Sequence, residues 1–254
     1  MVEETKSTNE LALKALSEGA AAGTVFVADH QTQGRGRRDI GGGRREWFSP
    51  KGTNLYLSAV IRPKLEMERL SAITLAVGVG LAQVIEEDTG VDVWLKWPND
   101  LYVGERKLGG VLTEGATGPG GFEGAVIGVG LNINVMAAQF PDSLKEVATS
   151  LRQETGQVHD RLTLAMKIST NLLQVCEEYV TYGLEGFSES LERYDRLVGR
   201  AVEVREEEGV RRGVACGIGV RGGLNVEFED GDVREIIAGG VVVDGLGGHS
   251  FQDD

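Results

Sequence analysis

Hydrophobic and polar residues alternate over some stretches of this chain and recur with helical spacing over others. Patterns typical of β-strands cover residues 24–28, 54–61, 91–97, 101–114 and 125–135. Helical spacing covers residues 66–88, 162–182 and 184–197. Within the first of these helices, residues 72–85 are almost entirely apolar. Such a run is too short to cross a bilayer, so we expect a buried helix and no membrane partner.

The pattern near the N-terminus predicts the start of a helix. Ser7-Thr8-Asn9-Glu10 places a hydroxyl residue three positions before a glutamate, which is the pattern of a capping box. We expect a helix from here to about Glu18, ended by Gly19. Residues 31–52 are rich in glycine and arginine and lack apolar periodicity, so they are predicted to form a loop.

After Gly199 the pattern changes to short apolar stretches separated by Gly, Asp and Glu. These stretches cover residues 201–205, 210–217, 224–228, 233–238 and 241–243. Short strands at this spacing predict a small β-barrel. We therefore expect an α+β domain with a mostly antiparallel sheet over residues 1–197, followed by a small barrel over residues 198–254.

Composition narrows the class of protein. The chain has 254 residues, of which 41% are hydrophobic and 26% charged, as expected of a soluble globular protein. Its formal net charge of −13 disfavours a general nucleic-acid binder, which is normally basic. The two cysteines indicate a reducing compartment, and neither they nor the scattered histidines form a metal-binding motif. The polar N-terminus is not a signal peptide, so the cytoplasm is the expected location.

The first stretch whose residues could bind a ligand or take part in catalysis is Gln33-Gly34-Arg35-Gly36-Arg37-Arg38. Glycines let the backbone wrap closely around a ligand, and guanidinium groups bind phosphates and carboxylates in a forked geometry. The combination suits an enzyme that holds an acyl-phosphate intermediate. Taken alone, the stretch is equally well interpreted as a solvated basic loop or an RNA-binding glycine–arginine tract.

Three further motifs follow along the chain. Residues 96–101 read KWPNDL, which places a lysine and a carboxylate at the end of a strand, although Pro-Asn-Asp is also ordinary turn chemistry. Residues 106–114 read RKLGGVLTE, in which a lysine precedes two glycines at the start of an apolar strand. Residues 128–134 read GVGLNIN and set an amide side chain among glycines, which would also fit a strand bulge.

The order of these motifs is far more specific than any one of them. Ser-Thr-Asn at 7–9 comes first, then the Gly-Arg loop, Trp47-Phe48-Ser49-Pro50, KWPNDL, RKLGG and GxGxNxN. In this order the chain resembles the biotin–protein ligases over nearly its whole length. The resemblance implies a class II synthetase-like catalytic domain followed by an SH3-like β-barrel. It also implies ATP and Mg²⁺ as co-substrate and ion, biotin as substrate, a biotinoyl-AMP intermediate, and a biotin carboxyl carrier protein whose lysine is the acceptor.

The resemblance carries roles to particular residues. Contacts to biotin would come from Ser7, Thr8, Asn9, Gln31, Arg35, Gly36, Arg37, Lys107 and Gly110. Contacts to the nucleotide would come from Arg35, Arg37, Trp47, Lys107 and Asn132. The catalytic residues would be Lys107, Arg37 and Asp100, with Asp100 orienting an arginine or helping to deprotonate the acceptor lysine. No residue is assigned as a metal ligand.

The chain also departs from the family pattern. Between Arg37 and Trp47 it is about five residues longer, through residues 39–43, and Gly240 stands where the family has glutamate. No helix-turn-helix segment precedes Ser7, so we expect no DNA binding, while a homodimer is left open. A lipoate–protein ligase is the alternative enzyme, because residues 37–43 resemble its Arg-Arg-x-x-Gly-Gly-Gly, but its following His-Asp pair is absent. A non-catalytic biotin-sensing module would lack the active lysine, and Lys107 is present.

Overall fold

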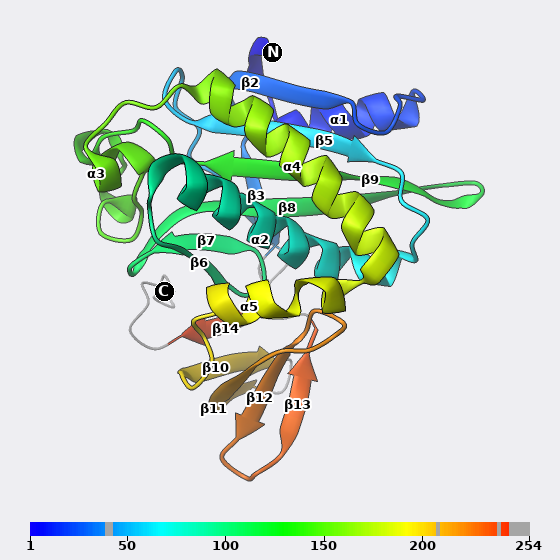
Figure 1. The fold of residues 1–254 in the computed structure, drawn as a ribbon, viewed down its shortest axis with the longest axis vertical. Helices are drawn as coiled ribbons and strands as arrows, with labels where there is room; N and C mark the ends of the chain where they lie inside the picture. Colours follow the sequence, from blue (N-terminus) through cyan, green and yellow to red (C-terminus); the bar gives the residue numbers. More distant parts are fainter. Residues whose placement is uncertain (39–42, 207–208, 238–239, 244–254) are drawn as a thin grey trace.

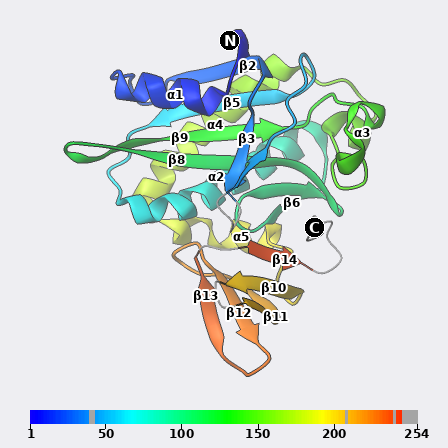
Figure 2. The same cartoon turned by 180° about the vertical axis from the view of Figure 1, so that it is seen from behind.

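A computed structural model describes residues 1–38, 43–206, 209–237 and 240–243 of the chain. Its largest element is a seven-stranded sheet with the order β1-β2-β5-β9-β8-β7-β6 (Figures 1 and 2). All neighbours in this sheet are antiparallel except β1 and β2. The strands are β1 (Val2–Thr5), β2 (Val25–Gln31), β5 (Leu55–Ile61), β6 (Val93–Lys96), β7 (Asp100–Val103), β8 (Arg106–Gly118) and β9 (Gly121–Leu131).

The two faces of this sheet are covered by different helices because side chains alternate along each strand. Helices α2 (Leu70–Thr89) and α4 (Arg161–Tyr182) cover one face, and α1 (Thr8–Ser17) covers part of the other (Figures 1 and 2). On β9, Ala125, Ile127 and Val129 belong to the main core, whereas Val126 packs with Ala12 and Leu16 of α1. The predicted α+β class and mostly antiparallel sheet are confirmed.

Helix α2 is the buried helix that the apolar run predicts. With the preceding 3₁₀ turn (Met67–Arg69) it spans residues 67–89, which makes it long and apolar enough to cross a membrane. In the structure 78% of an 18-residue apolar stretch of this helix is buried inside the protein, between the sheet and α4. The apolar run of residues 72–85 is thus only part of a longer helix, and the predicted core helix is confirmed.

The tail forms a second antiparallel sheet of five strands with the order β13-β12-β11-β10-β14. These strands are β10 (Ala201–Glu206), β11 (Gly209–Ile218), β12 (Leu224–Phe228), β13 (Val233–Ile236) and β14 (Gly240–Val243). Their apolar residues join the same core as the large sheet, next to α5 (Ser188–Tyr194). The indole of Trp97 also donates to the carbonyl of Gly222 at 2.9 Å. We keep a domain boundary at residues 197/198, between α5 and β10, as a proposal.

Three local features differ from the sequence predictions. Residues 31–52 are not only loop, because β3 (Arg35–Arg38) and β4 (Arg44–Glu46) pair as a hairpin. Strand β1 and the short helix α3 (Leu151–Thr155) were not predicted, since each is too short to show a period. The capping box is wrong: Ser7 precedes α1 but makes no side-chain cap, and Gln31 instead accepts the first helical amide.

The remaining elements connect these units. Three further 3₁₀ turns lie at Ala137–Gln139, Asp142–Leu144 and Leu184–Phe187. The last of these turns and α5 together account for the helical pattern over residues 184–197. The five-residue extension after Arg37 falls on residues 39–43, of which only Gly43 lies within the described part of the chain.

Candidate active site

Glycines remove side chains from one face of the large sheet, the face that α1 shares. Gly110 of β8 pairs with Gly130 of β9, and both therefore point to the same face. Gly128 lies two residues before Gly130 on this face, beside α1. The hairpin β3–β4 lies over the sheet on the same side (Figure 2). These three glycines form the glycine stripe, against which the side chains of Asn9, Trp47 and Asp100 pack.

The first group of predicted residues joins the start of α1 to the end of β2. Oε1 of Gln31 accepts hydrogen bonds from the Thr8 amide at 2.8 Å and the Thr8 hydroxyl at 3.1 Å. Nε2 of Gln31 donates to the hydroxyl of Ser49 at 3.1 Å. Ser7 is buried beside them. These polar groups are thus fixed in one arrangement before any ligand arrives.

Asn9 is held by four neighbours. Its Nδ2 donates to Oε2 of Glu114 at 2.8 Å and to the carbonyl of Leu112 at 3.2 Å. Its Oδ1 accepts from the hydroxyl of Ser58 at 2.6 Å and lies 2.0 Å from where a Cβ on Gly128 would be. The amide is therefore locked in orientation, and the absence of a side chain at position 128 is what makes room for it.

Arg35 of β3 faces the same carboxylate. Its Nη2 lies 3.6 Å from Oε2 of Glu114, too far for a hydrogen bond. Both Nε and Nη2 of Arg35 are buried without a hydrogen-bond partner. Buried donors without acceptors are costly, so this guanidinium is prepared for an anion that would supply the missing acceptors.

Trp47, directly after β4, covers the glycine stripe. Its indole packs against the backbone of Gly130, where an added Cβ would lie 2.7 Å from Cε2. The indole Nε1 is buried without a partner. The Trp47 carbonyl accepts from the Ser49 hydroxyl at 2.8 Å, which links the indole to the group around Gln31. A second unpaired donor therefore lies beside the stripe.

The second group of predicted residues centres on Lys107. Its Nζ lies 2.6 Å from Oδ1 of Asp100 and 5.4 Å from the centre of the Trp47 ring. Asp100 pairs in register with Gly110, and a Cβ on Gly110 would lie 2.9 Å from the Asp100 carboxylate. Gly110 is thus needed for the carboxylate to lie over the sheet beside Lys107.

Two more cations lie near Asp100. Burial lowers the pKa of the Arg37 guanidinium, while the Asp100 carboxylate opposes this shift. Burial also lowers the pKa of the Lys96 ammonium, again opposed by Asp100. Lys96 pairs in register with Asp100 at the sheet edge. Three basic side chains therefore surround one carboxylate, which gives the site a net attraction for anions.

Asn132 lies apart from this carboxylate, at the end of β9. It is buried, and its Oδ1 accepts from Nδ2 of Asn54 at 3.0 Å. Oδ1 of Asn54 accepts in turn from the amide of Ile133 at 3.0 Å. The backbone amide of Asn132 donates to the carbonyl of Leu108, one residue after Lys107, so the main chain at Asn132 lies beside the strand of Lys107.

The structure thus brings most of the predicted residues together around the glycine stripe, with Gly36 on β3 and Asn132 beyond the end of β9. Glu114, Ser49, Ser58 and Asn54 hold them in place and were not assigned roles from the sequence. Glu114 was visible as the last residue of the RKLGGVLTE motif, where its alternation with Gly110 and Leu112 places it on the site face. Ser49 stands in the motif of residues 47–50, whereas Ser58 and Asn54 are ordinary polar residues and carry no such signal.

No group of three or more His, Cys, Asp or Glu within the described residues is arranged to hold a metal ion. A divalent ion that arrives with a nucleotide takes most of its ligands from phosphates and water. The oxygens that this site offers, from the carboxylates of Asp100 and Glu114 and the amide of Asn132, fit an ion of that kind.

Comparison with known proteins agrees with this geometry. The sequence profile of the biotin/lipoate A/B protein ligase family matches residues 1–132. The bifunctional ligase/repressor BirA of Bacillus subtilis is 33% identical over 225 residues, which cover 89% of this chain and 68% of that protein. The biotin–[acetyl-CoA-carboxylase] ligase of Mycobacterium tuberculosis is 31% identical over 177 residues, covering 68% and 61% of the two chains.

Solved structures give the same result. The biotin protein ligase of Aquifex aeolicus in complex with biotin and ATP superposes with a TM-score of 0.81 at 31% identity. The match covers 95% of this chain and 96% of that one, so it includes the C-terminal sheet. The chain belongs to the biotin/lipoate A/B protein ligase family.

Proposed function

We propose that this protein is an ATP-dependent biotin–protein ligase, which forms biotinoyl-5′-AMP and transfers biotin to a lysine of a biotin carboxyl carrier protein. One observation carries the proposal: Arg35 and Trp47 have buried donors without hydrogen-bond partners on the glycine face of the sheet, and the ammonium of Lys107 lies 5.4 Å from the centre of the Trp47 ring. Such a site fits an extended ligand with an anionic end. The relatives named above are biotin ligases, which favours biotin over lipoate as that ligand.

Within this proposal, biotin lies along the stripe. Its polar ring end contacts the group formed by Ser7, Thr8, Asn9 and Gln31, whose hydrogen bonds are already in place. Its carboxylate lies at the other end, where Arg37 and Lys107 supply positive charge near Asp100. Arg35 contacts the ligand nearer to Asn9, since both residues face Glu114. Gly36 and Gly110 let the backbone approach the ligand closely. Trp47 and Asn132 are on the nucleotide side.

In the first step a biotin carboxylate oxygen attacks the α-phosphorus of ATP, and the bond to pyrophosphate breaks. The two reactants are both anions, so their approach requires cations that neutralise the growing charge. Lys107 and Arg37 fill this role. A Mg²⁺ ion bound with the nucleotide would neutralise further phosphate charge. The mixed anhydride reacts with water, so the hairpin carrying Arg35 and Arg37 is expected to exclude solvent from it.

In the second step the neutral amine of the carrier lysine attacks the acyl carbon, and AMP leaves. The amine must first lose a proton, since lysine is charged at neutral pH. Asp100 is the carboxylate that takes this proton. It is available once Lys107 has turned from Asp100 toward the adenylate, because the two groups are paired in the free protein.

An exchange assay tests the proposal. Labelled pyrophosphate should enter ATP when biotin is supplied, and purified biotin carboxyl carrier protein should then accept the label of radioactive biotin. Exchange with lipoate in place of biotin would instead support the alternative, a lipoate–protein ligase. Binding of biotin with no exchange under either condition would make the protein a sensor and would sink the enzyme assignment.

The proposal also covers the location of the enzyme, its binding to DNA and its oligomeric state. We place the enzyme in the cytoplasm and propose that it binds no operator DNA, given the net charge of −13. A mobility-shift assay with promoter fragments and competitor DNA checks the second statement, and a specific complex at physiological salt would contradict it. A homodimer is the third part, and light scattering with and without biotin and ATP measures it.

A further inference from the structure

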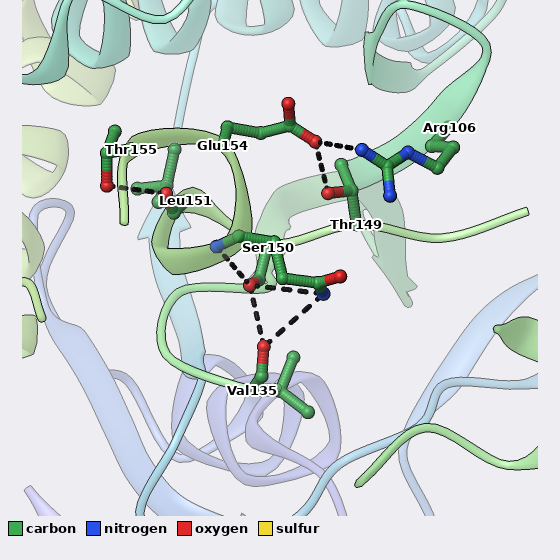
Figure 3. A network of polar contacts seen from close by, with 8 residues as sticks. Arg106, Val135, Thr149, Ser150, Leu151, Glu154 and Thr155 are labelled. Atoms are coloured by element: carbon green, nitrogen blue, oxygen red, sulfur yellow. Dashed lines mark hydrogen bonds and ion pairs between the residues drawn. The ribbon is translucent and has the colours of Figure 1, made fainter. Parts of the chain in front are cut away.

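A network centred on Glu154 holds the strand that carries Lys107 (Figure 3). Oε1 of Glu154 accepts a hydrogen bond from Nη2 of Arg106 at 2.8 Å and another from the hydroxyl of Thr149. Arg106 is the residue directly before Lys107, and Thr149 is fully buried. One carboxylate oxygen therefore ties the start of β8 to the segment that leads into α3.

The same segment clamps the main chain of Lys107 from both sides. The Lys107 amide donates to the carbonyl of Val147 at 2.8 Å, and the Lys107 carbonyl accepts from the amide of Thr149 at 2.9 Å. Lys107 and Ala148 thus form a short parallel bridge. The direction in which the Lys107 side chain leaves the strand is set by this bridge.

The segment also reaches the end of β9. The amide of Leu151 donates to the carbonyl of Asn132 at 3.1 Å, and that of Arg152 donates to the carbonyl of Ile133 at 2.8 Å. Ser150 fixes the segment in turn, since its hydroxyl donates to the carbonyl of Val135 at 2.7 Å and accepts from the amide of Gln153 in the first turn of α3 (Figure 3). Residues 147–152 therefore join the strand ends that carry Lys107 and Asn132.

We propose that Glu154 is a positioning residue for the adenylation step, acting through Thr149 and Arg106 on Lys107. This inference rests on the proposed function. Hydrogen bonds to an ionised carboxylate are about twice as strong as neutral ones, so Glu154 is the strongest tie in the network. Removing it frees the Thr149 hydroxyl and the Arg106 guanidinium together, and Lys107 loses the support that keeps its ammonium beside the reacting anions.

Substitutions at Glu154 and Thr149 separate positioning from general stability. Glu154→Ala should lower kcat for biotin-dependent pyrophosphate exchange by about 10–100-fold, because misplacing a reacting group by about 1 Å costs up to about 10²-fold. KM for biotin should stay within about threefold, since the biotin ring site around Thr8 and Gln31 is not tied to Glu154. Glu154→Gln keeps an acceptor oxygen and should recover most of the lost rate. Thr149→Val removes one donor and should cause an intermediate loss.

Thr155→Val is the matched control on the same helix. Its hydroxyl donates to the carbonyl of Leu151 within α3 and has no bond to the strand of Lys107 (Figure 3). It should leave kcat within about threefold of the original protein. Equal losses in Thr155→Val and Glu154→Ala would overturn the proposal, as would Glu154→Ala with a normal kcat. If Glu154→Ala fails to fold, a normal kcat in Thr149→Val overturns it.

A second measurement does not depend on biotin chemistry. Without ligands, hydrogen exchange at the amides of Lys107 and Thr149 should be faster in Glu154→Ala than in the original protein, because the bonds between β8 and residues 147–149 protect these amides. Exchange in α1 should stay unchanged. Unchanged exchange at both amides would overturn the inference even if the enzyme is active. If the original protein has no biotin-dependent activity but Glu154→Ala still exchanges faster at these amides, the structural role of Glu154 is upheld and the proposed function is refuted.

Discussion

The ammonium nitrogen of Lys107 lies 2.6 Å from Oδ1 of Asp100, although the two residues belong to different strands. The contact is within charge-assisted hydrogen-bond distance, and both side chains are partly exposed toward the glycine stripe. In the proposed reaction Lys107 must face the phosphate and Asp100 must be free to accept a proton. The proposed reaction therefore requires this pair to separate when the adenylate forms.

Replacing Lys107 with Ala should remove adenylation while biotin binding is largely kept. The loss of one charge-stabilising group costs about 10²–10³-fold in rate. Pyrophosphate exchange measures the rate, and calorimetric titration measures biotin binding. Lys145→Ala is the control, since Lys145 pairs with Asp142 on the surface. Near-normal exchange in Lys107→Ala would disprove the role of this lysine.

Replacing Asp100 with Asn should slow the transfer step more than adenylation. A general base contributes about 10²–10⁴-fold, and asparagine fills the same space but does not accept the proton. Single-turnover transfer from purified biotinoyl-AMP to the carrier isolates this step, and pyrophosphate exchange reports the other. The exposed Asp142→Asn is the control. If both steps slow equally, Asp100 serves only to hold Lys107.

Most of the sheet and the long helices could be predicted from periodicity alone. The strand pattern over residues 101–114, for example, is divided in the structure between β7 and β8. Elements that depend on distant partners could not be predicted. Strand β1 exists because β2 is beside it, and β3–β4 forms despite a sequence of glycines and arginines.

The candidate site was predictable as far as motifs mark it. Asp100 belongs to KWPNDL and both Lys107 and Gly110 to RKLGGVLTE, and the three residues lie side by side on β7 and β8. The residues that support them were missed, because Glu154 lies in a five-residue helix with no motif and its partners are 5 and 48 positions away. Such support depends on tertiary contacts that a single sequence does not display.

The two cysteines should differ sharply in reactivity. Burial raises the pKa of the Cys176 thiol to about 12, with a smaller contribution from Glu177. At pH 8 its reactive thiolate is therefore nearly absent, whereas Cys216 is exposed. Ellman's reagent should modify one thiol of the native protein at pH 8 and both in guanidinium chloride. Cys216→Ser should abolish the native reaction. Two fast native thiols would contradict the buried position of Cys176.

Glu114 should be needed for biotin binding through Asn9. Glu114→Ala leaves the Asn9 amide without one acceptor, and an unsatisfied buried donor costs about 1–3 kcal/mol, or roughly tenfold or more in affinity. Glu114→Gln keeps an acceptor for Asn9 but loses the attraction to Arg35, which at 3.6 Å is weak. We expect Kd for biotin to rise about tenfold in the first variant and less than threefold in the second. Equal effects would show that Arg35 is the partner that matters.

Gly128 gives the sharpest test of the glycine stripe. A Cβ at this position would lie 2.0 Å from Oδ1 and 2.8 Å from Cγ of Asn9, closer than real Cβ contacts allow. Neither the backbone at Gly128 nor the side chain of Asn9 can move easily to relieve this contact. Gly128 is paired with Ser58 and Leu112 in neighbouring strands, and Asn9 is bonded to Ser58, Leu112 and Glu114.

Gly128→Ala should therefore displace Asn9, with a strain of about 1–3 kcal/mol that lowers both Tm and biotin affinity. Gly120→Ala is the matched control, because a Cβ there meets no atom within 4 Å. It adds the same methyl group to the hairpin that joins β8 and β9, away from Asn9. Thermal unfolding and calorimetric titration of both variants give the comparison. If Gly128→Ala binds biotin as tightly as Gly120→Ala, Asn9 does not form part of the biotin site.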